Sequence, residues 1–126
     1  MSIYGQGLDV TLVAGADLSA QQYKVVGQIA AGVTVLATSA DNVYGVLQSK
    51  PQLGEFGTIR KFGYSKLYMS CSLGDGALIM GSNANSGQIA LATSGYCAFG
   101  EVFISAASGS FGTAYLYGGA LKRLIV

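Results

Sequence analysis

The side chains that could carry chemistry are six carboxylates and two thiols, and the chain contains no histidine. Without histidine, the commonest general base and the Ser-His-Asp arrangement are both missing. Two carboxylates far apart in sequence could still meet in space, as glycoside hydrolysis requires. Structural roles account for several of them, because Asp41 and Asp75 adjoin turn-forming residues and Asp9 alternates outward on an expected strand. We therefore expect no enzyme, no catalytic residue and no small-molecule substrate, and a small hydrolase is a disfavoured alternative. The acidic residues are Asp9, Asp17, Asp41, Glu55, Asp75 and Glu101.

The thiols and the glycine-rich stretch predict no metal and no cofactor. Cys71 and Cys97 are 26 residues apart, and without histidine they do not form a zinc site. Both lie in apolar, strand-like surroundings, so we expect buried free thiols, with a disulfide as the alternative. The stretch GDGALIMG at 74–81 lacks the spacing of a dinucleotide loop, and Asp75-Gly76 is typical of a hairpin turn.

Basic and aromatic residues interleave in TIRKFGYSK, residues 58–66, where Arg60, Lys61 and Lys66 alternate with Phe62 and Tyr64. Such a strip can bind single-stranded nucleic acid. The net charge is only +1, however, so no broad basic field exists to hold a phosphate backbone. We interpret the strip as an exposed strand edge kept soluble by its charges, and we expect no nucleic-acid partner.

The composition is that of a subunit whose surface is covered in an assembly. Only 10% of the 126 residues are charged, 51% are apolar, and 19 are glycine. A near-zero net charge favours association between proteins. No apolar run approaches the ~20 residues of a membrane span. No basic residue precedes Lys24, so we expect no signal peptide and no membrane partner.

The hydrophobic pattern predicts strands with a two-residue alternation. Residues 8–14 alternate apolar and polar side chains, as do residues 66–73, where Leu67, Met69, Cys71 and Leu73 share one face. Glycine-rich and Asn-rich turns separate many further short runs, and the best helix candidate, residues 16–26, is too short to stand alone. We predict an all-β fold: a small β-barrel or β-tulip-like domain over residues 8–126, with short strands, glycine-rich turns and little helix.

The chain contains an internal sequence repeat at an offset of 55 residues. LATSADNVYGVLQSKPQLGEFGTIRKFG at 36–63 matches LATSGYCAFGEVFISAASGSFGTAYLYG at 91–118, without a gap and with 10 identities in 28 positions. Chance agreement among abundant small residues is the alternative. The paired aromatics Phe56/Phe111 and Tyr44/Phe99 favour a duplicated strand–loop–strand unit.

The stretch YGVLQSKPQLGEFGTIRKFG resembles the tailed-bacteriophage capsid decoration, or cement, proteins. In that family a Gly-Val-Leu-Gln segment leads through a proline turn to Gly-Glu and a strand, as at 45–48, Pro51 and 54–55 here. ADLSAQQYKVVG and the region 72–95 are similar to the family's flanking segments. The resemblance implies a virion structural protein, made in the host cytoplasm, that binds the exterior of the capsid, often as a homotrimer. Its partner would be the major capsid protein, and its role to stabilise the mature head against DNA pressure.

The alternatives are another phage structural role, such as a head fibre base or a tail protein, and a carbohydrate-binding module on a cell surface. For attachment we expect residues 1–7 to form a mobile arm that orders on the shell. The C-terminal LKRLIV is the alternative anchor. The predicted contact residues are Ile3, Tyr4, Arg60, Lys61, Tyr64, Lys122 and Arg123.

Overall fold

The computed structural model describes residues 7–30, 32–37, 43–82, 86–92, 97–117 and 123–124. These residues form strands, turns and loops, and none of them lies in a helix. The expected all-β, barrel-like fold is confirmed, whereas the helix candidate at 16–26 is wrong and contains turns leading into a strand. Within this part of the chain, no helix has the length and apolar character that crossing a membrane requires. The strands are β1 (Gly7–Ala14), β2 (Val25–Ala30), β3 (Val33–Leu36), β4 (Gly45–Leu47), β5 (Phe56–Tyr68), β6 (Leu78–Gly81), β7 (Ile89–Leu91), β8 (Cys97–Ala98), β9 (Gly100–Ile104), β10 (Phe111–Tyr117) and β11 (Arg123–Leu124).

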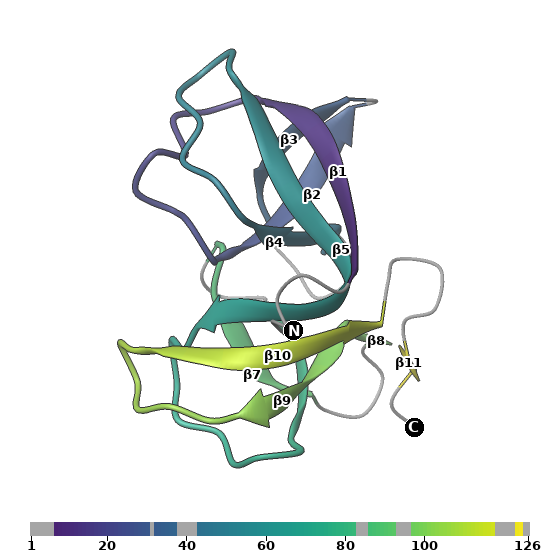
Figure 1. The fold of residues 1–126 in the computed structure, drawn as a ribbon, viewed down its shortest axis with the longest axis vertical. Coiled ribbons are helices and arrows are strands. Elements are labelled where there is room, and N and C mark those ends of the chain that lie inside the picture. The colour runs from purple at the N-terminus through teal and green to yellow at the C-terminus, as the bar shows by residue number, and fades with distance from the viewer. Residues whose placement is uncertain are drawn as a thin grey trace.

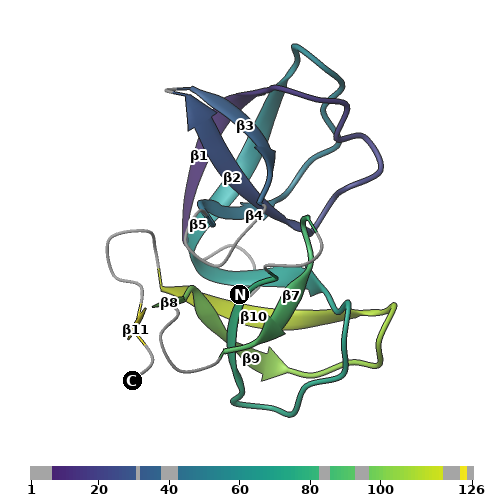
Figure 2. The ribbon, with the colours of Figure 1, turned by 180° about the vertical axis from the view of Figure 1, so that it is seen from behind.

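Nine strands form one sheet in the order β1-β3-β2-β4-β5-β10-β9-β6-β7, and β11 pairs with β8 in a small second sheet. The large sheet curls into two lobes, one above the other in Figure 1. The first lobe is a closed ring, because β1 pairs with β3 in parallel and with β5 in antiparallel orientation. The second lobe contains β10, β9, β6 and β7, and is seen from behind in Figure 2.

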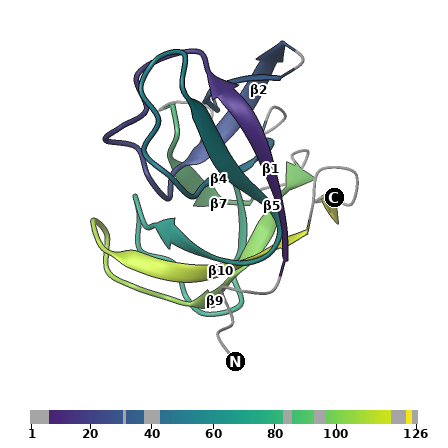
Figure 3. The same cartoon turned by 45° about the horizontal axis from the view of Figure 1, so that its top comes forward.

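Strand β5 belongs to both lobes. Its first half pairs with β1 and β4, and its second half pairs with β10. Between the halves lies Gly63, whose φ of 101° is a backbone conformation that side chains with a Cβ rarely adopt. Figure 3 shows β5 turning from its place beside β1 to its place beside β10.

The sequence interpretation of this region was therefore wrong in two respects. The strip 58–66 is not a sheet edge, since β5 is hydrogen-bonded along its length to β1, β4 and β10. The strand expected at 66–73 ends at Tyr68, although Leu67 and Met69 are fully buried as the alternation predicted. A local pattern cannot show that one strand is long enough to serve two neighbouring lobes.

The hydrophobic interior is in two parts. Six buried side chains fill the first lobe, namely Leu12, Ala14, Leu18, Val26, Leu47 and Ile59. A larger cluster fills the second lobe and continues beneath the first, where Val25 and Val46 of β2 and β4 join it with no exposed surface. The outer face of the first lobe at β2 and β4 is thus buried by the second lobe.

The strand pairing of the first lobe recurs in the second. Adding 55 to the β4–β5 pairs Val46↔Arg60 and Leu47↔Ile59 gives the β9–β10 pairs Glu101↔Tyr115 and Val102↔Ala114. The pairing of β1 with β5 is equivalent to the pairing of the second half of β5 with β10. Adding 55 to the pair Val13↔Phe56 gives the pair Tyr68↔Phe111. The correspondence therefore covers about residues 8–62 and 63–117, more than the predicted units 36–63 and 91–118.

Loop hydrogen bonds recur as well. The amide of Gly54 donates to the carbonyl of Ala14, and that of Gly109 donates to Met69. The region 21–28 corresponds to 74–81 at an offset of 53, because β2 and β6 hold matching places beside β4 and β9. Tyr23 and Gly76 are equivalent by this criterion. Both have positive φ, 68° and 81°, and their amides donate to the equivalent carbonyls of Leu47 and Val102.

Candidate binding surfaces

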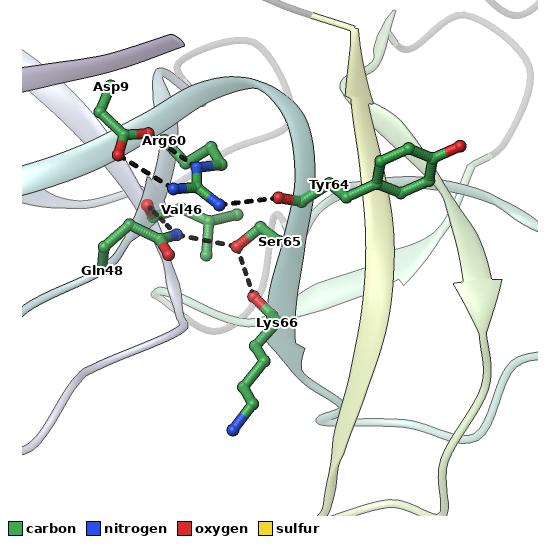
Figure 4. Close-up of polar contacts among 7 residues, drawn as sticks. All are labelled: Asp9, Val46, Gln48, Arg60, Tyr64, Ser65 and Lys66. Atoms are coloured by element: carbon green, nitrogen blue, oxygen red, sulfur yellow. Dashed lines mark hydrogen bonds and ion pairs between the residues drawn. The ribbon is translucent and has the colours of Figure 1, made fainter. Parts of the chain in front are cut away.

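An ion pair lies where the chain passes from the first lobe to the second (Figure 4). The Arg60 guanidinium donates through Nε to one Asp9 carboxylate oxygen at 2.7 Å and through Nη2 to the other at 3.0 Å. Its Nη1 donates to the Tyr64 backbone carbonyl at 2.9 Å, beyond the bend in β5. The hydrogen bond to Asp9 raises the pKa of Arg60, so the guanidinium stays charged. Arg60 is engaged within the chain and braces the bend.

A second polar connection crosses the same boundary. The Gln48 side-chain amide donates to the Ser65 hydroxyl at 2.8 Å and to the Val46 carbonyl at 3.1 Å. The Ser65 hydroxyl in turn donates to the Lys66 carbonyl at 2.7 Å, and Ser65 is fully buried. No buried side-chain polar atom of the described residues lacks a partner, as burial requires.

Tyr23 forms the aromatic part of the interlobe contact. Its ring packs edge-on against Phe111 of β10 with 5.6 Å between centroids, and the Lys66 ammonium lies 5.6 Å from the same ring. The Tyr23 carbonyl accepts a hydrogen bond from the Tyr68 amide at 2.9 Å. Tyr23, Val46, Gln48 and Arg60 therefore define the face of the first lobe on which the second lobe rests.

The outer face of the second lobe carries a cluster of aromatic rings. Tyr64 of β5 is edge-on to Phe103 of β9 and to Tyr115 of β10, with centroids 5.0 and 5.1 Å apart. Phe62 and Tyr117 contact Tyr115 at 5.9 and 6.1 Å. The Tyr64↔Tyr115 strand pair occupies the place that Asp9↔Arg60 occupies in the first lobe. At equivalent positions the first lobe therefore has an ion pair and the second lobe has a contact between two aromatic rings.

This cluster borders an open hollow of about 330 Å³, which we call the aromatic hollow. Its lining residues are Tyr64, Gly76, Glu101, Val102, Phe103 and Tyr115. Phe103 is 47% exposed, and the Glu101 carboxylate forms no hydrogen bond or ion pair with the described residues. An apolar wall with one carboxylate suits an apolar partner that also carries a basic group.

The first lobe carries an exposed apolar end. Phe56 at the start of β5 is 72% exposed, and Leu53 in the preceding turn is 69% exposed. Phe56 lines a shallow hollow of about 440 Å³ together with Ser49, Lys50, Pro51 and Glu55. Aromatic side chains are enriched at partner-binding surfaces, so the exposed Phe56 makes this end of the first lobe a candidate surface for a partner.

The described residues contain no group of three potential metal ligands. Hydrogen bonds from Ser19 lower the pKa of Asp17, and hydrogen bonds from Ser105 lower that of Asp75, through hydroxyl and backbone groups in each case. A general acid at neutral pH needs the opposite shift. Burial raises the pKa of the Cys71 thiol, which is free but only half-buried, so the expectation of a buried thiol was wrong. Cys71 lies beyond the end of β5, and the side chain of Cys97 lies outside the described residues.

The predicted contact residues are spread over the molecule. Arg60 is held by Asp9, and the Lys61 ammonium lies 4.0 Å from the centre of the Tyr44 ring. Tyr64 is part of the aromatic hollow. Ile3, Tyr4 and Lys122 lie outside the described residues, and only the backbone of Arg123 is described, paired with Ala98 in β11.

Sequence reasoning missed Phe56, Glu101 and Phe103 as surface residues. The alternation in β9 contained the signal, because Val102 is buried between Glu101 and Phe103. Sequence reasoning treated Phe56 only as the repeat equivalent of Phe111 and made no prediction of its exposure.

The fold places the chain in a class of small, helix-poor β proteins with a two-lobed, barrel-like sheet. No family model matches the sequence, and the search of curated proteins found no match. Among solved structures it is similar to the head fibre gp8.5 N base of bacteriophage phi29, with a TM-score of 0.66 and 12% sequence identity. The similarity covers 86% of this chain and 92% of that one, so it extends over both lobes.

Proposed function

We propose that this chain is a structural protein of a phage particle that binds the outer surface of the head. The observation that carries the proposal is the shared fold with the phi29 head fibre base over 86% of the chain. The resemblance of residues 45–55 to capsid decoration proteins supports the same conclusion from sequence. Exposed apolar side chains on both lobes supply surface for partners.

In its primary form the proposal is a cement role. Each subunit bridges neighbouring copies of the major capsid protein, and many modest contacts over a lattice give high total avidity. A protein that binds only the mature lattice stabilises that state by linkage, because dissociation must precede opening of the shell. The head would thereby resist the pressure of its packaged DNA.

The structural similarity favours a second form, in which the chain is the base of a head fibre. As a fibre base the chain would lie on the shell exterior and carry a projecting fibre. The two forms differ in what extends from the particle surface. A cement protein adds density close to the shell, whereas a fibre base would carry a projection that electron microscopy can detect.

Attachment is proposed to use the N-terminal segment. Ile3 and Tyr4 would fill apolar pockets of the capsid protein while the backbone adds to an exposed strand edge. Ordering costs about 1–2 kcal/mol per residue, so the segment must gain specific contacts to bind. We further propose that three copies associate on the shell.

The test uses particles assembled without this protein, to which the purified chain is added back. Binding is measured by sedimentation and by electron microscopy, and stability by the temperature at which DNA is released. We expect saturable binding to the exterior, and for the cement form a higher release temperature. A variant lacking residues 2–7 should bind less, with a truncation of 121–126 as the comparison. Absence of the protein from purified particles, together with no binding on add-back, would refute the proposal.

A further inference from the structure

The two lobes have equivalent faces. The face of the first lobe contacts the second lobe, whereas the equivalent face of the second lobe is open. On the first lobe the face contains Tyr23, Val46, Gln48 and Arg60, and the second lobe covers it through ring contacts, hydrogen bonds and shared core packing. The equivalent positions on the second lobe are Gly76, Glu101, Phe103 and Tyr115. All four line the aromatic hollow.

The hollow exists because a side chain is missing there. Tyr23 fills the first-lobe position and contacts Phe111, whereas its equivalent Gly76 has no side chain. A Cβ added to Gly76 would meet no atom within 4 Å. The second lobe therefore offers the receiving face of the interlobe contact with room for an additional aromatic ring.

The C-terminal strand of this chain does not repeat the course that covers the first lobe. In the first lobe the Tyr68 amide donates a hydrogen bond to the Tyr23 carbonyl. By the repeat, residue 123 is equivalent to Tyr68, and Gly76 is equivalent to Tyr23. Arg123 is instead paired with Ala98 in the small second sheet. The chain thus departs from the repeat at β11, so the β11 backbone does not repeat the contact that Tyr68 makes with Tyr23.

The surface that fits this kind of face is visible within the chain. The second lobe contacts Tyr23 of the first through Lys66 and Tyr68 of β5 and through Phe111 of β10, which is 53% exposed. The equivalents on the first lobe are Thr11, Val13 and Phe56. Thr11 and Phe56 are exposed, and Phe56 shows 72% of its surface.

We propose that the aromatic hollow binds a second copy of this chain, with Phe56 of that copy seated at Gly76 among Tyr64, Phe103 and Tyr115. The contact uses the positions equivalent to Phe111 and Tyr23 inside one molecule, with the Phe56 ring entering the space beside Gly76 that the Tyr23 ring fills on the first lobe. Charge supports the same orientation. Glu101 lines the hollow at the position equivalent to the buried Val46, and the exposed Lys50 lies beside Phe56 in the opposing surface. The exposed Glu55 of that surface accepts a hydrogen bond from the Gln52 amide of its own chain.

The proposed interface is heterologous, since each copy offers its hollow to one neighbour and its Phe56 end to another. Such head-to-tail contacts close into a ring when the rotation between copies allows, and otherwise continue as a filament. The inference concerns self-association of the purified protein and does not rest on the proposed attachment to a shell.

The first experiment measures self-association by analytical ultracentrifugation over a concentration series. Phe56→Ser and Phe103→Ser should each weaken association at least tenfold, because aromatic anchors dominate interface energy. Ile29→Ser is the matched control, as Ile29 is 63% exposed but outside both surfaces, and it should associate like the wild type. Because each variant keeps one intact surface, an equal mixture of the two should form a heterodimer.

The second experiment does not remove a large side chain. Glu101→Lys and Lys50→Glu should each weaken association, and mixing them in equal amounts should restore it, because each hollow then meets an opposite charge at position 50 of the other variant. A wild-type protein that stays monomeric at its highest soluble concentration would overturn the proposal. Association that is equally strong in Phe103→Ser, or variants that show no pairing when mixed, would also overturn it.

Discussion

Gly45 and Gly100 begin the equivalent strands β4 and β9, and each lies directly over a carbonyl of the neighbouring strand. A Cβ at Gly45 would lie 2.4 Å from the Arg60 carbonyl oxygen, and a Cβ at Gly100 would lie 2.4 Å from that of Tyr115. Such contacts are far inside van der Waals range. The obstructing atoms belong to the backbone of paired strands, so no side-chain rotation can relieve them.

We therefore predict that Gly45→Ala and Gly100→Ala each destabilise the protein by about 3 kcal/mol, the upper part of the range for overpacked interiors. With an unfolding entropy of about 2.1 cal/mol/K per residue, this corresponds to a fall in Tm of ~11 °C. Gly74→Ala is the control, because a Cβ there would meet nothing within 4 Å and its φ is not in the left-handed region.

The assay is thermal unfolding followed by circular dichroism, with urea unfolding as a second measure of the free energy. The Tm values of Gly45→Ala and Gly100→Ala should fall by similar amounts, since the lobes share the same strand pairing at these positions. If either variant unfolds within about 1 °C of Gly74→Ala, the close approach at that site is wrong. A large fall in one variant only would contradict the equivalence of the two lobes.

Three further predictions concern single side chains. Arg60→Ala should cost about 1–2 kcal/mol and more than Asp9→Ala, because the arginine also satisfies a strand carbonyl; equal urea midpoints would contradict this. The pKa of Asp75 lies below its ordinary 3.8, so its charge stabilises the fold above that pH and the benefit disappears as pH falls through the lowered value. Asp75→Asn should thus lower Tm at neutral pH but not in strong acid, and an NMR titration giving a pKa above 3.8 would refute the shift. In a Cys97→Ser background, Cys71 should react with Ellman's reagent more slowly than a free thiol at pH 8 and should speed up in urea, because burial raises its pKa.

The sequence alone predicted the fold class, because two-residue alternation and glycine-rich turns are local properties. Leu12, Leu67 and Val102 are buried as their strand positions required. The internal sequence repeat at an offset of 55 likewise required only the order of residues. No local pattern, however, could show that Gly63 bends one strand between two lobes, or that residues 58–66 lie within the sheet and not at its edge.

The candidate surfaces depended on tertiary structure to a greater degree. Val46 and Glu101 hold equivalent strand positions, yet one is buried beneath the second lobe and the other borders an open hollow. Likewise Phe111 contacts the Tyr23 ring and is 53% exposed, whereas the equivalent Phe56 is 72% exposed. Sequence determines which positions correspond, because strand register follows residue order. Whether a corresponding position is covered depends on which other segment packs over it, since the second lobe covers the first and β11 leaves the repeat to pair with β8.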